Sequence, residues 1–399
     1  MLRGSRRAAR ITRGWIEIAA LAAAATAAVI AGGTLAAFAV ARRAVTPAVR
    51  RLADTIVHAV DVPAQTITLS RTPDTVLPGR YGLFVTGTRR YLKLGAVLDD
   101  DGGRVTRKLL TQITADDRVG AAAAFSGWYF DAPEQLHVPF SEVEVPAPVG
   151  ACPAWLFPAE GEARADTWAI AVHGRGTTRA EVLRAVPVFR EAGVATLAIS
   201  YRNDTEAPAS SSGRYGLGAT EWRDVDAAIA FARAQGARRI VLMGWSMGGA
   251  IALQTALQSR HADAIAGLIL ESPVVDWRTV LAFQARELRV PRALTHIAMR
   301  QLTLPRWSRA VRWGNAISLD DLDIVRRADE LRQPILLLHS DDDGFVPSDA
   351  SHALAAERPD LVTLRTYREA RHTKLWNYDE ARWSGEIRDW LASLGLGRS

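Results

Sequence analysis

Cysteine is almost missing from this chain, which has Cys152 as its only thiol among 399 residues. An internal disulfide is therefore impossible, and we expect Cys152 to be a small buried residue rather than a nucleophile. The sequence also lacks internal repeats, and its one biased tract is an alanine-rich run near the N-terminus. Nothing in the sequence calls for a metal or an organic cofactor, so we expect neither.

Basic stripes interleaved with aromatic residues are also absent beyond the N-terminal region. Residues 1–51 contain nine arginines and one acidic residue, Glu17, which gives this segment a net charge of +8. Because the whole chain has a net charge of +6, the remainder is close to −2. The excess of positive charge therefore indicates membrane topology and no nucleic-acid partner.

Residues 18–40 contain no charged side chain and are long enough to span a bilayer as a helix, which takes about 20 residues. A cleavable signal peptide has a shorter apolar core of about 7 to 15 residues, so an uncleaved anchor is favoured. Small residues at Ala37, Ala39 and Ala41 leave cleavage open as the alternative. Five arginines precede the span and four follow it, which favours an N-terminus inside and an extracytoplasmic remainder. We predict a single-pass membrane protein.

Residues 52–142 have the features of a β-rich extension. The segments 65–69 and 81–86 alternate as strands do, and Pro78-Gly79 between them is a turn signal. The segment is too apolar to remain an unfolded stalk. We expect it to pack against the following domain, with Trp128 and Tyr129 as candidates for a substrate wall.

From residue 143 onward, apolar runs of strand length alternate with segments of helical spacing. The expected strands are 138–146, 151–157, 167–172, 194–201, 239–243, 266–270, 335–338 and 361–367, and the clearest expected helices are 180–192 and 220–234. This alternation predicts an α/β domain with a doubly wound, mostly parallel sheet. Functional sites of such sheets lie at the carboxyl ends of the strands.

A Gly-x-Ser-x-Gly pattern occupies residues 244–248, directly after the expected strand 239–243. The pattern is typical of a nucleophile elbow, a sharp turn between strand and helix that exposes a serine hydroxyl. The glycines are needed because the turn is strained and the helix packs tightly against the strand. We therefore predict that Ser246 is the nucleophile of an acyl-transfer reaction.

A serine nucleophile needs a general base, and five histidines lie C-terminal to Ser246: His261, His296, His339, His352 and His372. His339 ends an expected strand and His352 falls in an expected helix, so we interpret both as structural. His372 lies in a loop between the last expected strand and the terminal helix. A catalytic imidazole reaches its serine from such a loop, so His372 is the predicted base.

The carboxylate that orients the base has several candidates. Asp341, Asp342 and Asp343 follow the expected strand 335–338 in a polar turn, and Glu271 ends the strand before it. Each of these carboxylates lies at the carboxyl end of an expected strand, where the acid of a catalytic triad is expected. A structural interpretation is that the aspartate cluster caps the helix that begins near Ser348.

Four segments, in the right order, resemble the α/β-hydrolase superfamily: residues 173–176, 244–248, 339–347 and 372–373. The resemblance covers about residues 143–391 and implies the α/β-hydrolase fold. It implies that Asp343 is the acid, as the aspartate of a His-Gly-x-x-Asp-x-x-Val-Pro pattern. It also implies an oxyanion hole formed by the backbone N–H groups of Met247 and Arg175.

Two residues depart from the family pattern. Ser340 stands where glycine is usual, and Arg175 is a bulky cation beside the expected oxyanion hole. The Arg175 side chain has two interpretations, namely binding of an acidic substrate group or pairing with a carboxylate on the rim of the site. We favour the rim.

Residues 274–326 form an insertion between two expected strands and are predicted to be a helical lid. Its apolar side chains either contact an apolar substrate or only pack the lid: Trp277, Phe283, Leu288, Met299, Trp307 and Trp313. Its basic residues favour acidic substrates or anionic lipid, or form a solvated helix face: Arg286, Arg289, Arg292, Arg300, Arg306, Arg309 and Arg312.

These features predict three parts: a membrane anchor over residues 1–51, a β-rich extension over 52–142, and a hydrolase domain over 143–399. The predicted function is that of a membrane-anchored serine hydrolase acting on a small acyl ester or a lipid with an apolar acyl group. A peptidase, a thioesterase and an acyltransferase stay as alternatives, because they share the triad. The alternative of another class is a catalytically silent, membrane-tethered interaction module.

Overall fold

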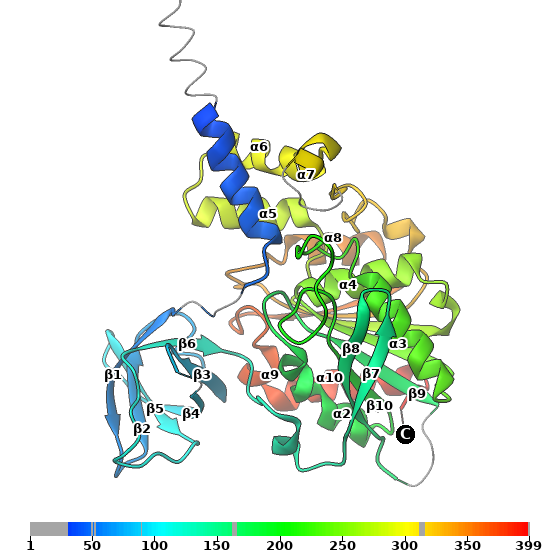
Figure 1. The fold of residues 1–399 in the computed structure, drawn as a ribbon. Coiled ribbons are helices and arrows are strands. Elements are labelled where there is room, and N and C mark those ends of the chain that lie inside the picture. Colours follow the sequence, from blue (N-terminus) through cyan, green and yellow to red (C-terminus); the bar gives the residue numbers. More distant parts are fainter. Residues whose placement is uncertain are drawn as a thin grey trace, which may run out of the picture.

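The computed structural model describes residues 31–48, 51, 53–88, 90–161, 166–310 and 316–397. Three parts are distinguished in Figure 1: an N-terminal helix, a small β-barrel, and a larger unit in which helices surround a sheet.

The N-terminal helix comprises residues 31–45. Of the predicted anchor, residues 18–30 lie outside the described residues, and within the described part no helix has the length and apolar character needed to cross a membrane. The helix lies beside the helical insertion of the larger unit (Figure 1), where Gln301 Nε2 donates to the Thr34 carbonyl at 3.2 Å. Its side chains Ala37, Ala41 and Val45 are buried in the same core as the sheet.

The β-rich extension forms a closed antiparallel barrel in the order β1-β2-β5-β4-β3-β6. Its strands are β1 (Thr55–Asp61), β2 (Thr66–Ser70), β3 (Tyr81–Val85), β4 (Tyr91–Asp100), β5 (Arg104–Leu109) and β6 (Ala122–Ser126). Alternate residues such as Ile67 and Leu69 point into the barrel core. Arg107 is fully buried there, and burial lowers its pKa to about 10.

The larger unit contains an eight-stranded sheet in the order β14-β13-β12-β11-β9-β10-β8-β7. Its strands are β7 (Ser141–Ala147), β8 (Gly150–Phe157), β9 (Thr167–Val172), β10 (Ala195–Ile199), β11 (Arg239–Trp245), β12 (Ile265–Glu271), β13 (Ile335–Ser340) and β14 (Val362–Tyr367). Strands β9 to β14 pair in parallel, whereas β8 pairs antiparallel with β7 and β10. The predicted doubly wound, mostly parallel sheet is confirmed.

Helices cover both faces of this sheet. One face packs against α3 (Trp222–Ala234), α4 (Met247–Gln258) and α8 (Asp349–Glu357), and the other against η2 (Arg179–Ala185), α2 (Val186–Glu191) and α10 (Glu380–Ser393). The short elements are η1 (Pro133–Leu136), η3 (Ala262–Ala264), η4 (Ala328–Glu330) and α9 (Leu375–Tyr378). The expected helix 180–192 is split in two. Pro187 lacks a backbone N–H and lies in the first turn of α2, after a 3₁₀ segment.

The predicted lid region contains α5 (Trp277–Glu287), α6 (Arg292–Thr303) and α7 (Pro305–Ala310), between β12 and β13. Residues 311–315, which include Arg312 and Trp313, lie outside the described residues. The arginines whose exposure is described are exposed: Arg286, Arg289, Arg292, Arg300 and Arg306. The segment is helical as expected, and its action as a lid stays a prediction.

Candidate active site

Ser246 occupies the turn between β11 and α4, with φ of 52° and ψ of −117°. This left-handed backbone is strained for a residue with a Cβ, and the surrounding packing enforces it. A Cβ on Gly244 would lie 2.4 Å from the Gly248 carbonyl oxygen, and a Cβ on Gly248 would lie 2.1 Å from the Val172 carbonyl oxygen. The two glycines of the motif are therefore required by close backbone contacts, within the turn for Gly244 and with the end of strand β9 for Gly248.

Three predicted site residues lie in one line of hydrogen bonds. His372 Nε2 is 3.1 Å from Ser246 Oγ, and His372 Nδ1 is 2.7 Å from Asp343 Oδ2. Because an ionised carboxylate can only accept, the ring proton belongs on Nδ1, and Nε2 accepts from the serine hydroxyl. This tautomer is the one that a general base acting on Ser246 requires.

Asp343 is buried, and its environment keeps it ionised. Its Oδ1 accepts from the backbone N–H groups of Phe345 and Val346, each at 2.8 Å. Burial on its own would raise the pKa of Asp343, but His372 and His339 outweigh that effect and hold the pKa well below its usual range.

His339 is a second imidazole beside this acid. Its Nε2 is 3.3 Å from Asp343 Oδ2 and 3.0 Å from the Val346 carbonyl, while its Nδ1 is 2.8 Å from Ser351 Oγ. Its position at the end of β13 indicated a structural residue, but the sequence held no signal for its contact with the acid.

Two of the other three candidate carboxylates, Asp341 and Glu271, have partners other than His372. Asp341 accepts from Ser348 Oγ and pairs with His352 Nε2 at 2.8 Å. Glu271 is fully buried and accepts from the indole N–H groups of Trp245 at 2.8 Å and Trp383 at 2.9 Å. Neither carboxylate lies in the hydrogen-bond line of His372.

Asp342 and Ser340 connect the loop after β13 to the loop that carries the histidine. Ser340 Oγ donates to Asp342 Oδ1 at 2.6 Å and accepts from Ala370 N at 3.0 Å, and Asp342 Oδ1 also accepts from Arg371 N at 2.9 Å. The serine that replaces the usual glycine therefore has a structural role in joining the two loops.

The two predicted oxyanion donors come from separate elements. Met247 is the first residue of α4, so its N–H belongs to the helix turn that lacks intrahelical acceptors. Arg175 follows His173-Gly174, after β9, and both Arg175 and Ser246 line one cavity.

The Arg175 side chain does not pair with a rim carboxylate as we expected. Its Nη2 donates to the backbone carbonyls of Arg43 at 2.6 Å and Thr46 at 2.8 Å, at the end of the N-terminal helix. The sequence interpretation was wrong because carbonyls at a helix C-terminus are acceptors that leave no mark in residue types.

A buried ion pair supports the loop that carries Arg175. His173 Nε2 is 3.0 Å from Asp204 Oδ2, and Glu181 accepts from Gly174 N at 2.7 Å. Burial opposes a charged imidazole, but the Asp204 carboxylate outweighs it and raises the pKa of His173 above its ordinary value. The His173 contact in turn lowers the pKa of the buried Asp204 carboxyl, so the pair favours the charged form of both groups.

A largely apolar cavity of about 520 Å³ lies over Ser246. Part of its lining comes from the N-terminal helix (Ala39, Val40, Arg43 and Ala44), part from α5 and the residue after it (Trp277, Val280, Leu281 and Leu288), and part from the exposed side chain of Phe345. Of the apolar lid side chains singled out above, Trp277 and Leu288 line this cavity. The N-terminal helix as a cavity wall had no signal in the sequence.

Trp128 and Tyr129 are not among the residues that line this cavity. Tyr129 packs against Trp376, with ring centroids 5.6 Å apart, and Trp128 lies beneath the Arg51 guanidinium. The expected substrate wall is therefore wrong for this pair, which packs at the junction of the barrel and the larger unit.

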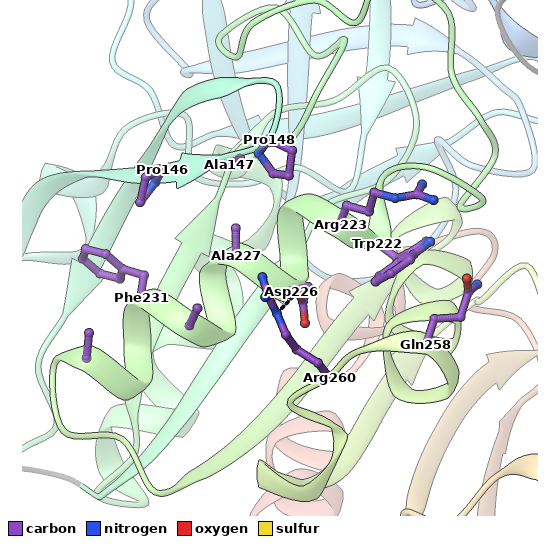
Figure 2. Close-up of a pocket in the computed structure, with 12 residues that line it drawn as sticks. Pro146, Ala147, Pro148, Trp222, Arg223, Asp226, Ala227, Phe231, Gln258 and Arg260 are labelled. Carbon is purple, nitrogen blue, oxygen red and sulfur yellow. Dashed lines mark ion pairs between the residues drawn. The ribbon is translucent and has the colours of Figure 1, made fainter.

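A second cavity of about 670 Å³ lies at the edge of the sheet, between β7 and α3 (Figure 2). Pro146, Trp222 and Phe231 line it, and its floor holds the pair Asp226–Arg260 at 3.4 Å. Among its described lining residues there is no serine, histidine or cysteine, so it offers no serine or thiol nucleophile with an imidazole base.

Cys152 is buried, and burial raises its pKa to about 12, which leaves the thiol protonated and unreactive. Over the described ranges, no group of three or more histidine, cysteine, aspartate or glutamate residues could hold a metal ion.

Two family profiles match the chain. The profile of the alpha/beta hydrolase family matches residues 169–388, and that of a domain of unknown function, DUF8805, matches residues 56–126, which is the barrel. No curated protein matches the chain.

Among solved structures, an esterase shares the fold of the larger unit. An esterase of Pyrococcus furiosus aligns with a TM-score of 0.51 at 15% identity, over 66% of this chain and 94% of the esterase. A puromycin-hydrolysing peptidase of Mycobacterium tuberculosis aligns with a TM-score of 0.47 at 19% identity, over 83% of this chain and 45% of the peptidase.

Proposed function

This chain belongs to the alpha/beta hydrolase family, and on that premise we propose that it cleaves carboxylic esters of apolar acyl groups with Ser246 as nucleophile. The family match confirms the prediction of a hydrolase. The proposal of an esterase depends above all on one observation, the line of hydrogen bonds from Asp343 through His372 to Ser246 beneath an apolar cavity.

In the acylation step, Ser246 Oγ attacks the ester carbonyl carbon while its proton passes to His372 Nε2. The carbonyl oxygen becomes an oxyanion, which the amides of Met247 and Arg175 stabilise. Asp343 stabilises the imidazolium that forms. When the carbon–oxygen bond breaks, His372 returns the proton to the leaving alcohol, and the acyl group remains on Ser246.

In the deacylation step, water gives a proton to His372 Nε2 and attacks the acyl carbon. The second oxyanion uses the same two amides. Its collapse returns the proton to Ser246 Oγ and releases the carboxylic acid, so the step consumes one water and restores the enzyme.

The substrate class follows from the cavity over Ser246. Its walls are mainly aliphatic and aromatic, which favours an acyl chain over a charged acyl group. Each buried methylene contributes about 0.8 kcal/mol of transfer free energy, so extending the chain along these walls strengthens binding until the cavity is full.

We also propose that the anchor predicted over residues 18–40 tethers the enzyme to a membrane through its part before residue 31, with the catalytic part outside the cytoplasm. Support comes from the uncharged span between two groups of arginines. The helix at the end of this span borders the Ser246 cavity, so a tethered enzyme has its acyl site close to the lipid surface.

The test is fluorophosphonate labelling of the wild-type chain, Ser246→Ala and His372→Ala, followed by turnover of p-nitrophenyl esters of increasing acyl length. We expect labelling only in the wild type and a fall in kcat of about 10⁶-fold in each variant. Ser259→Ala is the control, because Ser259 is buried near the other cavity and bonds to Asp226. A folded wild type that is never labelled would support the silent interaction module.

A further inference from the structure

The loop that carries His372 has left-handed backbone on both sides of the imidazole. Arg371 has a φ of 60° and Thr373 a φ of 49°. This region of backbone space costs free energy for residues that have a Cβ. A loop with such strain keeps its conformation only when neighbouring groups hold it, so the contacts of this histidine loop (residues 368–374) determine where His372 Nε2 lies.

Part of the support comes from the hydrolase domain. Arg371 donates to Asp342 twice, from its backbone N to Oδ1 at 2.9 Å and from Nη1 to the carbonyl at 2.7 Å. Thr373 N donates to Ser272 Oγ at 3.2 Å, and the Thr373 carbonyl accepts from Arg184 Nη1 at 2.8 Å. These contacts restrain the backbone on both sides of the base.

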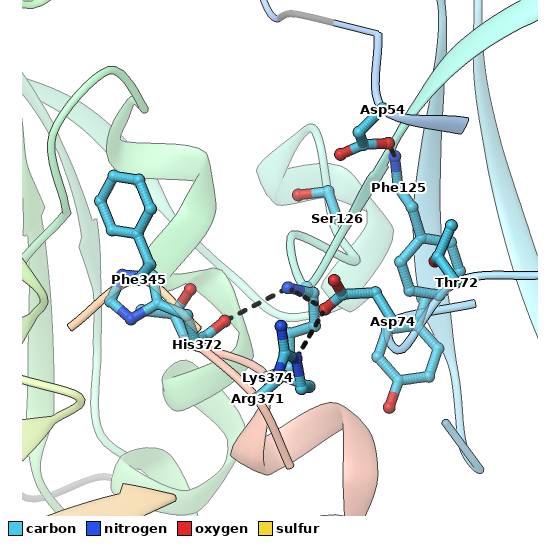
Figure 3. A network of polar contacts seen from close by, with 12 residues as sticks. Asp54, Thr72, Asp74, Phe125, Ser126, Phe345, Arg371, His372 and Lys374 are labelled. Atoms are coloured by element: carbon cyan, nitrogen blue, oxygen red, sulfur yellow. Dashed lines mark hydrogen bonds and ion pairs between the residues drawn. The ribbon is translucent and has the colours of Figure 1, made fainter. Parts of the chain in front are cut away.

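The remaining support comes from the barrel (Figure 3). Asp74 lies in the segment between β2 and β3 that we name the Asp74 loop (residues 71–80). Its Oδ1 is 3.0 Å from Lys374 Nζ and 3.8 Å from Arg371 Nε. Lys374 Nζ in turn donates to the His372 carbonyl at 3.4 Å. One barrel carboxylate therefore holds cations on both sides of the base.

The Asp74 loop is itself held from inside the barrel. The buried guanidinium of Arg107 donates to the carbonyls of Thr75 at 2.9 Å, Leu77 at 2.7 Å and Gly79 at 2.8 Å. These acceptors follow Asp74 directly along the chain. A buried, fixed cation thus gives the loop a defined conformation, and Asp74 points out of the barrel toward the histidine loop (Figure 3).

Close backbone contacts join the barrel to the hydrolase domain beside the histidine loop. A Cβ on Gly127, the residue after β6, would lie 2.6 Å from the Thr373 carbonyl oxygen. Asn377 Nδ2 donates to the Arg80 carbonyl at 2.7 Å, and Arg80 N donates to the Asn377 carbonyl at 3.3 Å. The barrel therefore contacts the histidine loop and the helix that follows it at several points.

We infer that the barrel positions the general base, with Asp74 as the positioning residue that holds the histidine loop through Lys374 and Arg371. The inference rests on the proposed role of His372, and it assigns a role to the barrel, which matches a domain of unknown function. Asp74 does not touch the reacting atoms. It acts by fixing the distance from His372 Nε2 to Ser246 Oγ, to which proton transfer is sensitive.

The experiment compares Asp74→Ala, Asp74→Asn and Asp74→Glu in the full chain. The matched control is Asp117→Ala, because Asp117 is a carboxylate of the same domain with a similar exposed side-chain fraction, 27% against 32%, and pairs at 2.7 Å with Arg90, which lies outside the Asp74 loop. We expect Asp74→Ala and Asp74→Asn to lower kcat about tenfold with KM unchanged. Asp74→Glu should recover most of kcat, because it restores the charge.

Amide hydrogen exchange of the histidine loop gives a readout that does not need a substrate. It should accelerate in Asp74→Ala and stay unchanged in Asp117→Ala. Equal kcat and equal exchange in these two variants would overturn the inference. So would a fall of kcat in Asp74→Ala that is accompanied by a fall of Tm and that Asp74→Glu does not recover. Ser246→Ala distinguishes the two proposals: activity in that variant contradicts the proposed function, while exchange still tests Asp74.

Discussion

Asp343 illustrates how much of the site depends on single residues. Four carboxylates lie at strand ends near the site, and only the family resemblance singled out Asp343 among them. Its two backbone donors and two imidazoles give it the environment that an ionised, orienting carboxylate needs. The contacts of Asp341, Asp342 and Glu271 lie elsewhere.

The choice of acid leads to a direct comparison. Asp343→Asn should lower kcat about 10⁴-fold, because the amide favours the wrong imidazole tautomer. Asp341→Asn, Asp342→Asn and Glu271→Gln should cost far less, and Glu271→Gln should mainly lower Tm, since Glu271 accepts from two buried indoles. Turnover of one p-nitrophenyl ester measures all four variants. Equal losses would mean that Asp343 is not the acid.

The pair His173–Asp204 predicts a pH-dependent contribution to stability. The pKa of His173 is raised, so its contribution is fully present below the unfolded-state value of about 6.5 and is lost as the pH rises through the folded pKa. Asp204→Asn should therefore lower the free energy of unfolding by about 3 kcal/mol near pH 6, and the difference should shrink at alkaline pH.

Urea denaturation at a series of pH values measures this difference. Asp320→Asn is the control, because Asp320 is exposed and pairs with Arg278 and Arg326, which do not titrate in this range. A constant difference between wild type and Asp204→Asn from pH 6 to pH 10 would contradict the assignment of charge to His173.

At the scale of elements, the N-terminal helix packs against the enzyme and lines its cavity, which its composition did not indicate. Its alanines and valines indicated a lipid-facing span, yet Ala37, Ala41 and Val45 are buried in the enzyme core, and Ala39, Val40 and Ala44 border the Ser246 cavity. Small apolar side chains suit close packing against protein as well as lipid. Hydropathy alone does not distinguish these surroundings.

Because the N-terminal helix lines the Ser246 cavity, we predict that its side chains limit the length of the acyl chain that is turned over. Val40→Trp should fill part of the cavity, shorten the acyl chain that is turned over best, and lower kcat/KM for the longest esters about tenfold or more. Leu35→Trp is the matched control, because Leu35 lies on the same helix, is 68% exposed, and does not line the cavity. The ester series used for the wild type measures both. An unchanged length profile in Val40→Trp would place the acyl chain elsewhere.

At the scale of the whole molecule, the three parts meet around one site. The sheet carries Ser246 and Asp343 at strand ends, the N-terminal helix closes one side of the cavity, and the barrel contacts the histidine loop. A truncated chain that begins near residue 60 would divide β1 (Thr55–Asp61) and open the barrel.

Membrane association is therefore best tested with a cut that keeps the helix. The full chain should sediment with membranes and resist extraction by high salt, because the apolar part of the span before residue 31 inserts in the bilayer. A chain without residues 1–30 should be soluble and keep its esterase activity, since residues 31–45 still border the cavity. Fractionation and p-nitrophenyl ester turnover measure both. A full chain that is soluble without detergent would contradict the anchor.

The sequence by itself determined the local elements and the chemistry that depends on them. Strands such as β9 were predictable because their apolar pattern extends over a few neighbouring residues. The elbow at residues 244–248 was predictable because its tight turn requires glycine at fixed positions near the serine. The placement of His372 between Ser246 and Asp343 was predictable from chain order and a family pattern. The same local signals failed at Arg175, whose acceptors are backbone carbonyls.

Only the tertiary structure decided which distant segments meet. The contact of His339 with Asp343, the cavity wall from the N-terminal helix, and the hold of Asp74 on the histidine loop have no sequence signal. The cavity wall and the Asp74 contact join segments that lie far apart in the sequence, and the topology of the sheet and the position of the barrel bring these segments together. Residue type specifies what a side chain can bond, whereas the packing of whole elements specifies what it reaches.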